Sequence, residues 1–110
     1  MTVGPFLADT HIILWSISDD RLFASAASVW EIAIKRSIRK LNAPDDLPTL
    51  LPRMQFQPLA VTFQHANVVG GLPHHHGDPF DRLLIAQAQV ENLTILTSNP
   101  HFARYDVALA

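Results

Sequence analysis

Three acidic residues stand out because each lies within or beside an otherwise apolar stretch. Asp9 ends an apolar run, Glu31 interrupts a second, and Asp81 precedes a third. A charged group near a hydrophobic core is costly unless it is paired or binds a metal. Carboxylate oxygens are the ligands that Mg²⁺ and Mn²⁺ prefer, and mutual repulsion between acids favours a bound cation. Convergence of these acids would therefore form a divalent-cation site.

Each acid also has a structural alternative. Asp9 could cap a helix that follows it, and Asp81 suits the first turn of a helix, where the helix dipole favours a negative charge. The residues from Ser28 to Glu31 match the capping-box pattern Ser-x-x-Glu, and Glu31 could pair with Lys35 one helical turn later. The sequence alone leaves these alternatives open.

The segments that must position the acids alternate between strands and helices. Short apolar runs bounded by breaks predict strands at 3–8, 22–24, 59–63, 93–97 and 107–109. Helical periodicity and capping signals predict helices at 10–17, 25–41, 50–54, 64–69 and 78–90, with a short turn near Phe102. Asp78 is a suitable N-cap for the long helix, and Pro79 suits its first turn.

This alternation predicts an α/β fold with an open, mostly parallel sheet. Ligands of such sheets bind outside the carboxyl ends of the strands, where Asp9 and Asn99 both fall. The helix predicted at 25–41 has an apolar stripe through Val29, Ile32 and Ala33. We therefore expect the acids to meet at one edge of the sheet.

Composition limits the possible functions. The chain has 110 residues, of which 48% are hydrophobic and 16% charged, so we expect a single folded domain over 1–110. A net charge of −2 argues against a surface that coats nucleic acid generally. The absence of cysteine excludes thiolate metal sites and makes the cytoplasm the default compartment. No apolar run is long enough for a membrane span, so no membrane association is expected.

Three stretches together resemble a known family. The residues over 7–15, 25–35 and 72–88, above all the run DPFDRLLIAQA that begins at Asp78, resemble the VapC-like branch of the PIN domains. The resemblance follows the chain in order over almost its whole length. It implies a PIN-like three-layer α/β/α fold and a metal-dependent ribonuclease, the toxin of a type II toxin–antitoxin pair. It also implies an RNA substrate, a VapB-like or similar antitoxin, and a homodimer.

The resemblance also assigns roles to the acids. Asp9, Glu31 and Asp81 match the first three acidic positions of the family, and they would bind Mg²⁺ or Mn²⁺. A fourth acid is expected after the strand at 93–97, but this chain has Asn99 there. An amide offers a carbonyl oxygen without negative charge, so we expect weaker metal binding. The implied reaction is hydrolysis of an RNA phosphodiester, in which the ion activates water and steadies the developing charge.

Further residues receive weaker assignments. Thr10 and Ser98 are candidates for orienting water or the ligands themselves. Lys35, Arg39 and Arg82 are candidates for contact with RNA phosphates. Instead of contacting phosphate, the basic run over 35–40 could simply form a solvent-exposed face of a helix.

The chain departs from the family a second time between Asp20 and Arg21, where about one helix is missing. Together with Asn99, this departure supports an alternative function: a catalytically inactive PIN-like binding module that retains RNA or antitoxin binding. A phosphatase with Asp9 as nucleophile is a weaker alternative, because the second aspartate common at such strand ends is absent two residues on, at His11.

Two further groups have structural interpretations. The consecutive histidines His74, His75 and His76 suggest a transition metal, but three neighbours in one loop cannot all face one ion. We interpret them as loop or helix-entry residues. Trp15 and Trp30 lie in apolar stretches, and we expect both to pack in the core.

Overall fold

The computed structural model describes residues 5–10 and 22–110. Several sequence predictions lie outside these ranges: the start of the first strand, most of the helix expected at 10–17, Trp15, and the join between Asp20 and Arg21. The capping role considered for Asp9 depends on that predicted helix, so it also lies outside the described residues.

The core of the fold is a five-stranded sheet in which every strand pair is parallel. Its strands are β1 (Phe6–Ala8), β2 (Leu22–Ser25), β3 (Phe56–Leu59), β4 (Thr94–Leu96) and β5 (Ala108–Leu109). They lie in the order β3-β2-β1-β4-β5, so β1 occupies the centre. All five carboxyl ends therefore face one edge, as the predicted α/β class requires.

Helices and one 3₁₀ helix join the strands. They are α2 (Ala26–Ser37), α3 (Leu47–Arg53), α4 (Phe63–Val69), α5 (Pro79–Glu91) and the 3₁₀ helix η1 (Pro100–Arg104). Asp78 caps α5 as predicted, since its side chain accepts from the backbone N–H groups of Phe80 and Asp81. The other end of α5 stops at Asn92, which takes the left-handed conformation. No helix within the described residues is long and apolar enough to cross a membrane.

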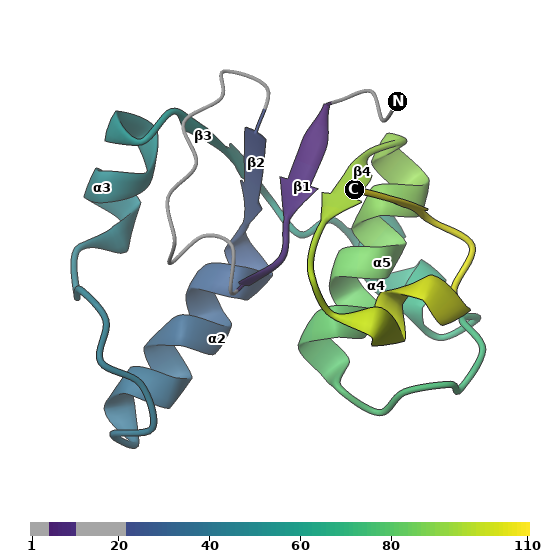
Figure 1. Cartoon of the computed structure of the whole chain (residues 1–110), viewed down its shortest axis with the longest axis horizontal. Coiled ribbons are helices and arrows are strands. Elements are labelled where there is room, and N and C mark those ends of the chain that lie inside the picture. The colour runs from purple at the N-terminus through teal and green to yellow at the C-terminus, as the bar shows by residue number, and fades with distance from the viewer. Residues whose placement is uncertain (1–4, 11–21) are drawn as a thin grey trace.

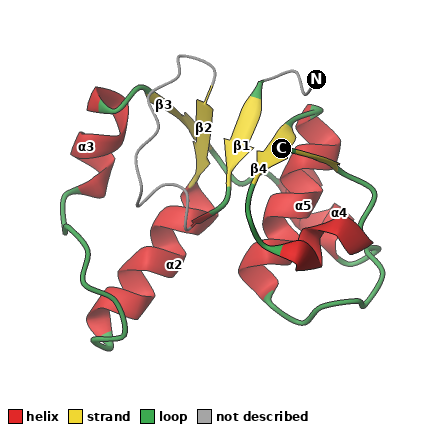
Figure 2. Ribbon diagram, viewed as in Figure 1, coloured by secondary structure: helices red, strands yellow, loops and turns green. Residues whose placement is uncertain are grey.

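Side chains on the two faces of the sheet enter different cores. Leu7 belongs to a cluster with residues of α5, whereas its neighbour Ala8 belongs to a cluster with residues of α2 and α3. This alternation is the period-two geometry of a strand buried on both faces. Figures 1 and 2 show the result: α2 and α3 lie on one side of the sheet, with α4, α5 and η1 on the other. The three-layer α/β/α fold is confirmed.

Several predicted boundaries were wrong. The helix expected at 50–54 is α3, which already begins at Leu47. The third strand is Phe56–Leu59, not 59–63, because Pro58 lies inside the strand instead of before it. The missing N–H of a proline is tolerated there because β3 is an edge strand. The helix expected over 25–41 is α2, which ends at Ser37; Arg39 follows with a left-handed φ of 60°.

Candidate functional site

Asp9 lies at the carboxyl edge of the sheet, directly after β1. Its backbone N–H donates to the carbonyl of Leu96 at 3.0 Å, which holds it beside the end of β4. Its carboxylate accepts a hydrogen bond from the Thr97 hydroxyl at 2.8 Å. Asp9 is buried, with 3% of its surface exposed. A hydroxyl from the neighbouring strand end therefore fixes a buried carboxylate.

Asn99 follows the end of β4 and is the N-cap residue of η1. Its backbone N–H donates to the Thr97 hydroxyl at 3.0 Å, and its side-chain Oδ1 accepts from the backbone N–H of His101 at 3.0 Å. The amide oxygen predicted as a metal ligand thus acts as a helix cap. A carbonyl oxygen has a second lone pair, so capping leaves room for one more partner.

Glu31 reaches the edge from the second turn of α2. It is buried, and it accepts from the Thr10 hydroxyl at 2.8 Å and from Lys35 Nζ at 2.9 Å. The N-cap of α2 is Ser25, so the capping box proposed for Ser28 and Glu31 was wrong. The proposed pairing with Lys35 is confirmed.

The Lys35 ammonium lies within a field of acids. The hydrogen bond and charge of Glu31 raise the pKa of Lys35, and the charges of Asp78 and Asp81 raise it further, although burial opposes them. The acid of α2 and the acids at the start of α5 are therefore close enough to influence one cation.

Asp81 lies in the first turn of α5, with 8% of its surface exposed. Burial raises the pKa of its carboxyl, and the nearby charges of Asp78 and Asp9 raise it further, while a hydrogen bond from His76 acts in the opposite direction. Its Oδ2 lies 2.8 Å from His76 Nε2. An anion in these surroundings is stabilised by a cation.

A group of side chains with ligand atoms lies at this position. Among the described residues, potential ligand atoms of His76, Asp78 and Asp81 all lie within 4.8 Å of one another. Carboxylate oxygens with one imidazole nitrogen form a donor set that suits a divalent cation. Asp81 is the one predicted metal ligand in this group; Asp9 and Glu31 lie outside it.

His76 and Thr97 were missed by sequence reasoning. The interpretation of His74 to His76 as loop residues holds for their backbone, but it overlooked the contact of one ring with Asp81. Thr97 could have been found, because it follows a strand that ends at the same edge as β1. No spacing rule identifies His76.

The structure corrects the role predicted for Arg82, contact with an RNA phosphate. Its guanidinium is buried and donates to the carbonyls of Pro73 at 2.7 Å, Val69 at 3.1 Å and Leu72 at 3.3 Å, and to the Tyr105 hydroxyl at 3.3 Å. These bonds tie the segment before α5 to the helix. Arg82 is therefore a structural residue, and the predicted phosphate contact does not fit its environment.

The two remaining predicted residues, Ser98 and Arg39, lie at different distances from the acids. Ser98 is exposed between Thr97 and Asn99, at the edge of the site. Arg39 is exposed and lies beyond Ser37, the end of α2, which is itself about 9 Å along the helix from Glu31. The structure does not bring Arg39 to the acids.

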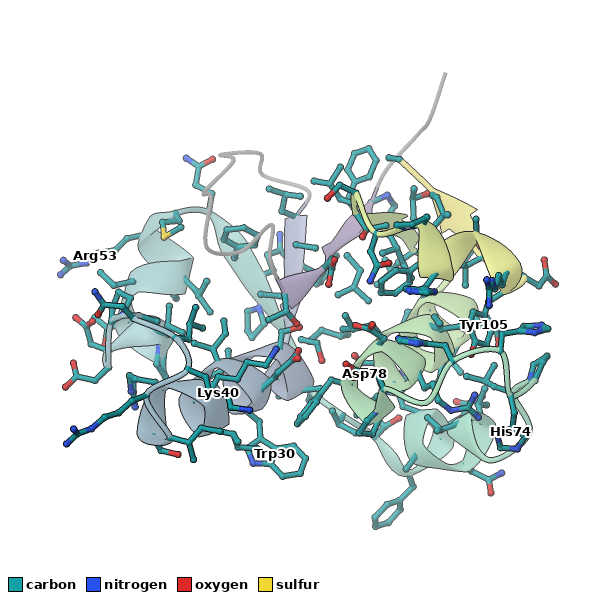
Figure 3. All side chains as sticks on the ribbon, turned by 60° about the horizontal axis from the view of Figure 1, so that its bottom comes forward. Trp30, Lys40, Arg53, His74, Asp78 and Tyr105 are labelled. Atoms are coloured by element: carbon teal, nitrogen blue, oxygen red, sulfur yellow. The ribbon has the colours of Figure 1, made fainter. Side chains whose placement is uncertain are left out.

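The prediction that Trp30 packs in the core was wrong. This residue is 61% exposed and so lies outside the core, and its ring meets Phe80 edge to face with 5.2 Å between ring centroids. Figure 3 shows Trp30 projecting outward from α2. The contact joins α2, which contains Glu31, to the first turn of α5, which contains Asp81.

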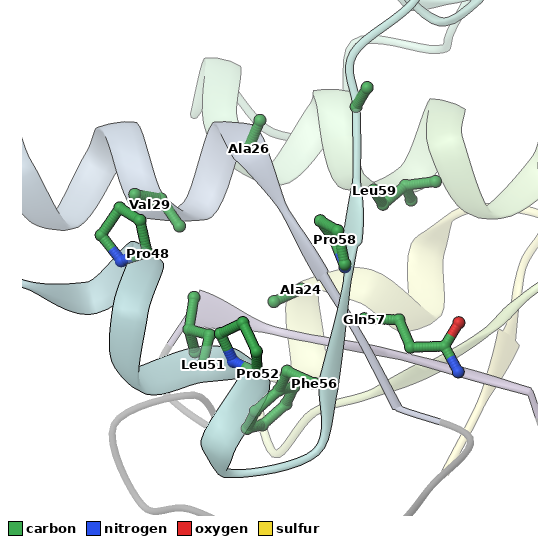
Figure 4. Close-up of a pocket in the computed structure, with 11 residues that line it drawn as sticks. Ala24, Ala26, Val29, Pro48, Leu51, Pro52, Phe56, Gln57, Pro58 and Leu59 are labelled. Atoms are coloured by element: carbon green, nitrogen blue, oxygen red, sulfur yellow. The ribbon is translucent and has the colours of Figure 1, made fainter.

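An apolar hollow of about 360 Å³ lies elsewhere, between α3, β3 and the start of α2 (Figure 4). Apolar side chains such as Val29, Leu51 and Phe56 line it, and the lining residues that the structure describes include no acid, histidine, lysine or arginine. The acids described above lie at the carboxyl edge of the sheet, which is the candidate catalytic site.

Comparisons with known proteins agree with this fold. The sequence profile of the PIN domain matches residues 5–108. VapBC2 from Rickettsia felis, solved bound to a DNA fragment from their promoter, is similar with a TM-score of 0.70, 16% identity and coverage of 96% of each chain. FitAcB from Neisseria gonorrhoeae gives a TM-score of 0.65 and 19% identity, covering 94% of this chain and 95% of that one.

DNA-bound VapBC from Salmonella typhimurium gives a TM-score of 0.69 at 16% identity and covers 98% of each chain. At such identities the structural likeness shows a shared fold alone. No curated protein matches the sequence significantly.

Proposed function

Because this chain belongs to the PIN-domain family, matched over residues 5–108, we propose that it is a metal-dependent endoribonuclease that uses Mg²⁺ or Mn²⁺ to hydrolyse RNA phosphodiesters. The observation that carries the proposal is the burial of three carboxylates: Asp9, Glu31 and Asp81 are 3%, 5% and 8% exposed, and the residue after Asp9, Thr10, donates to Glu31 at 2.8 Å. Buried carboxylates without enough cationic partners favour a bound cation. We expect the enzyme to act in the cytoplasm.

The chain's own residues would divide the work. Asp9, Glu31 and Asp81 would hold the ion, and Asn99 would supply an amide oxygen. The ion, when bound, would lower the pKa of a water molecule and stabilise charge that develops on the phosphate. The Thr97 hydroxyl fixes the carboxylate of Asp9 at 2.8 Å.

Thr10 and Lys35 both contact the carboxylate of Glu31. The Thr10 hydroxyl orients Glu31 at 2.8 Å, and the Lys35 ammonium pairs with it at 2.9 Å. Lys35 keeps 40% of its side chain exposed, so its ammonium can also meet an RNA phosphate at the mouth of the site. Ser98, exposed at the same edge, would contact substrate or water.

We also propose that the protein is the toxin of a toxin–antitoxin pair, with a VapB-like or similar antitoxin as its partner and a homodimer as its assembly. The support is that similar structures are complexes, VapBC2, FitAcB and VapBC. Light scattering of the purified chain, alone and with the product of an adjacent gene, would test both parts. A monomer that captures no partner would refute them.

Two observations favour the alternative, an inactive module that still binds RNA or an antitoxin. Asn99 lacks charge, and its Oδ1 already caps η1. Lys35 also neutralises Glu31 in part. Both features reduce the negative charge available to an ion.

Cleavage assays separate the two functions. Purified wild type, Asp81→Asn and the matched control Asp45→Asn, which alters an exposed loop acid, are incubated with a mixed structured RNA in Mg²⁺, Mn²⁺ or EDTA. The proposal expects metal-dependent cleavage by wild type and Asp45→Asn, and none by Asp81→Asn. Equal inactivity of all three folded proteins, with RNA or partner binding retained, would support the inactive module.

A further inference from the structure

We propose that His76 is a metal ligand alongside Asp81 and Asp78, and that it makes this site prefer first-row transition-metal ions such as Mn²⁺ and Zn²⁺ to Mg²⁺. The inference rests on the proposed function because Asp81 belongs to both. It goes further because the group of His76, Asp78 and Asp81 does not include Asp9 or Glu31, and because one of its donors is a nitrogen.

The spacing of the donors fits a single ion. Ligands about 2.0–2.2 Å from a metal lie about 3 Å apart when adjacent and about 4 Å apart when opposite. His76 Nε2 and Asp81 Oδ2 lie 2.8 Å apart, close to the adjacent spacing. With Asp78 included, no pair of ligand atoms exceeds 4.8 Å. Closure around an ion requires side-chain shifts of about 1 Å.

Contacts on the far side of the loop orient the His76 ring. It stacks on His101 with 4.8 Å between centroids and 4° between planes. Its main-chain carbonyl accepts from the Tyr105 hydroxyl at 3.4 Å. The stacking contact fixes the plane of the ring, and the hydrogen bond to Asp81 directs Nε2 toward the acid, so the nitrogen is positioned before any ion arrives. Such preorganisation favours binding.

The acids beside His76 remain able to coordinate. Asp78 Oδ1 accepts two backbone N–H groups as the cap of α5, but a carboxylate has about four acceptor positions. Asp81 is buried among negative charge from Asp78 and Asp9. A divalent ion that displaces the proton between His76 and Asp81 would relieve that repulsion.

The nitrogen donor determines which ions are favoured. Mg²⁺ binds oxygen and seldom imidazole, whereas imidazole suits Zn²⁺ well. Mn²⁺ prefers oxygen ligands but accepts a nitrogen ligand more readily than Mg²⁺ does. Asn99 supplies no charge where an acid was expected, so the site depends more strongly on its other donors. His76 adds a nitrogen donor without negative charge.

Metal binding tests the inference without reference to cleavage. Calorimetric titration with MnCl₂, ZnCl₂ and MgCl₂ is compared for wild type, His76→Gln and the control His75→Gln, whose ring contacts Tyr105 instead of an acid. Glutamine can keep a hydrogen bond to Asp81, so fold is preserved. We expect His76→Gln to weaken Mn²⁺ and Zn²⁺ binding by at least about tenfold, with little change for Mg²⁺ or for His75→Gln.

Pulsed electron paramagnetic resonance of the Mn²⁺-loaded protein gives a second readout. A coordinated imidazole produces nitrogen coupling, whereas a histidine that only orients a carboxylate does not. We expect the coupling in wild type and His75→Gln and its loss in His76→Gln. Absence of the coupling in wild type, which requires no variant to fold, would overturn the inference, as would its persistence in His76→Gln.

The same preparations separate failure of this inference from failure of the proposed function. RNA cleavage without nitrogen coupling would refute His76 as a ligand and leave the nuclease intact. Nitrogen coupling lost in His76→Gln, in a protein that cleaves no RNA, would support the metal site and refute the nuclease.

Discussion

Replacement of Arg82 by methionine should destabilise the protein severely. The guanidinium donates to three main-chain carbonyls and a hydroxyl over 2.7–3.3 Å, and the side chain is 7% exposed. Hydrogen bonds from a charged donor contribute about 1.5–3 kcal/mol each, and buried acceptors left unpaired add to the cost. Counting the two shortest bonds as decisive gives a loss of about 3–6 kcal/mol.

That loss is measurable by urea denaturation. With a slope of about 1.5 kcal/mol per M, the midpoint would fall by about 2–4 M, and the melting temperature by more than about 10 °C. The matched control is Arg36→Met, which removes one exposed bond to the carbonyl of Pro44 and should cost less than about 1 kcal/mol. A stable Arg82→Met protein with weakened RNA binding would refute the structural role and restore the phosphate contact.

Three further predictions concern the site. In metal-free buffer Asp81→Asn should raise the melting temperature at pH 7, because burial raises the pKa of Asp81 in the folded state. This gain in melting temperature should vanish at a pH below 3.8, the ordinary pKa of the carboxyl, because the acid is then protonated in both the folded and the unfolded state. Asn99→Asp should tighten Mn²⁺ binding by calorimetry and change stability by less than about 0.5 kcal/mol, because Asp caps as well as Asn; unchanged affinity would exclude position 99 from the site. Trp30→Ala should cost less than about 1.5 kcal/mol in urea, since the ring is 61% exposed and loses one aromatic contact; a core-sized loss would contradict its exposure.

The strand-end part of the site could be predicted from sequence because it depends on backbone topology. An apolar run that stops at Asp9 predicts a strand end, and parallel strands bring such ends to one edge. Asp78 and Pro79 likewise predicted the start of α5, because capping is local. These elements needed no knowledge of distant packing.

His76 and Arg82 could not be assigned because their partners are set by the path of a loop. The segment over 69–76 folds back on α5, so that carbonyls surround Arg82 and the His76 ring meets Asp81. Neither strand nor helix periodicity applies to such a segment. Sequence therefore identified the acid but not its imidazole partner.

Trp30 is an error that periodicity could have prevented. The buried residues of α2 include Ala27, Ser28, Glu31 and Ile32, which form one stripe at helical spacing. Trp30 is two residues from both Ser28 and Ile32, about 200° around the helix from each. Apolar neighbours in sequence suggested burial, but the stripe that contains Glu31 places Trp30 on the opposite face.

The most direct test of the nuclease is cleavage of a mixed structured RNA by wild type and Asp81→Asn, each with Mn²⁺, Mg²⁺ and EDTA. We predict cleavage that requires the metal and is lost in Asp81→Asn, while both proteins melt cooperatively. A well-folded wild type that leaves the RNA intact with every metal would contradict the account.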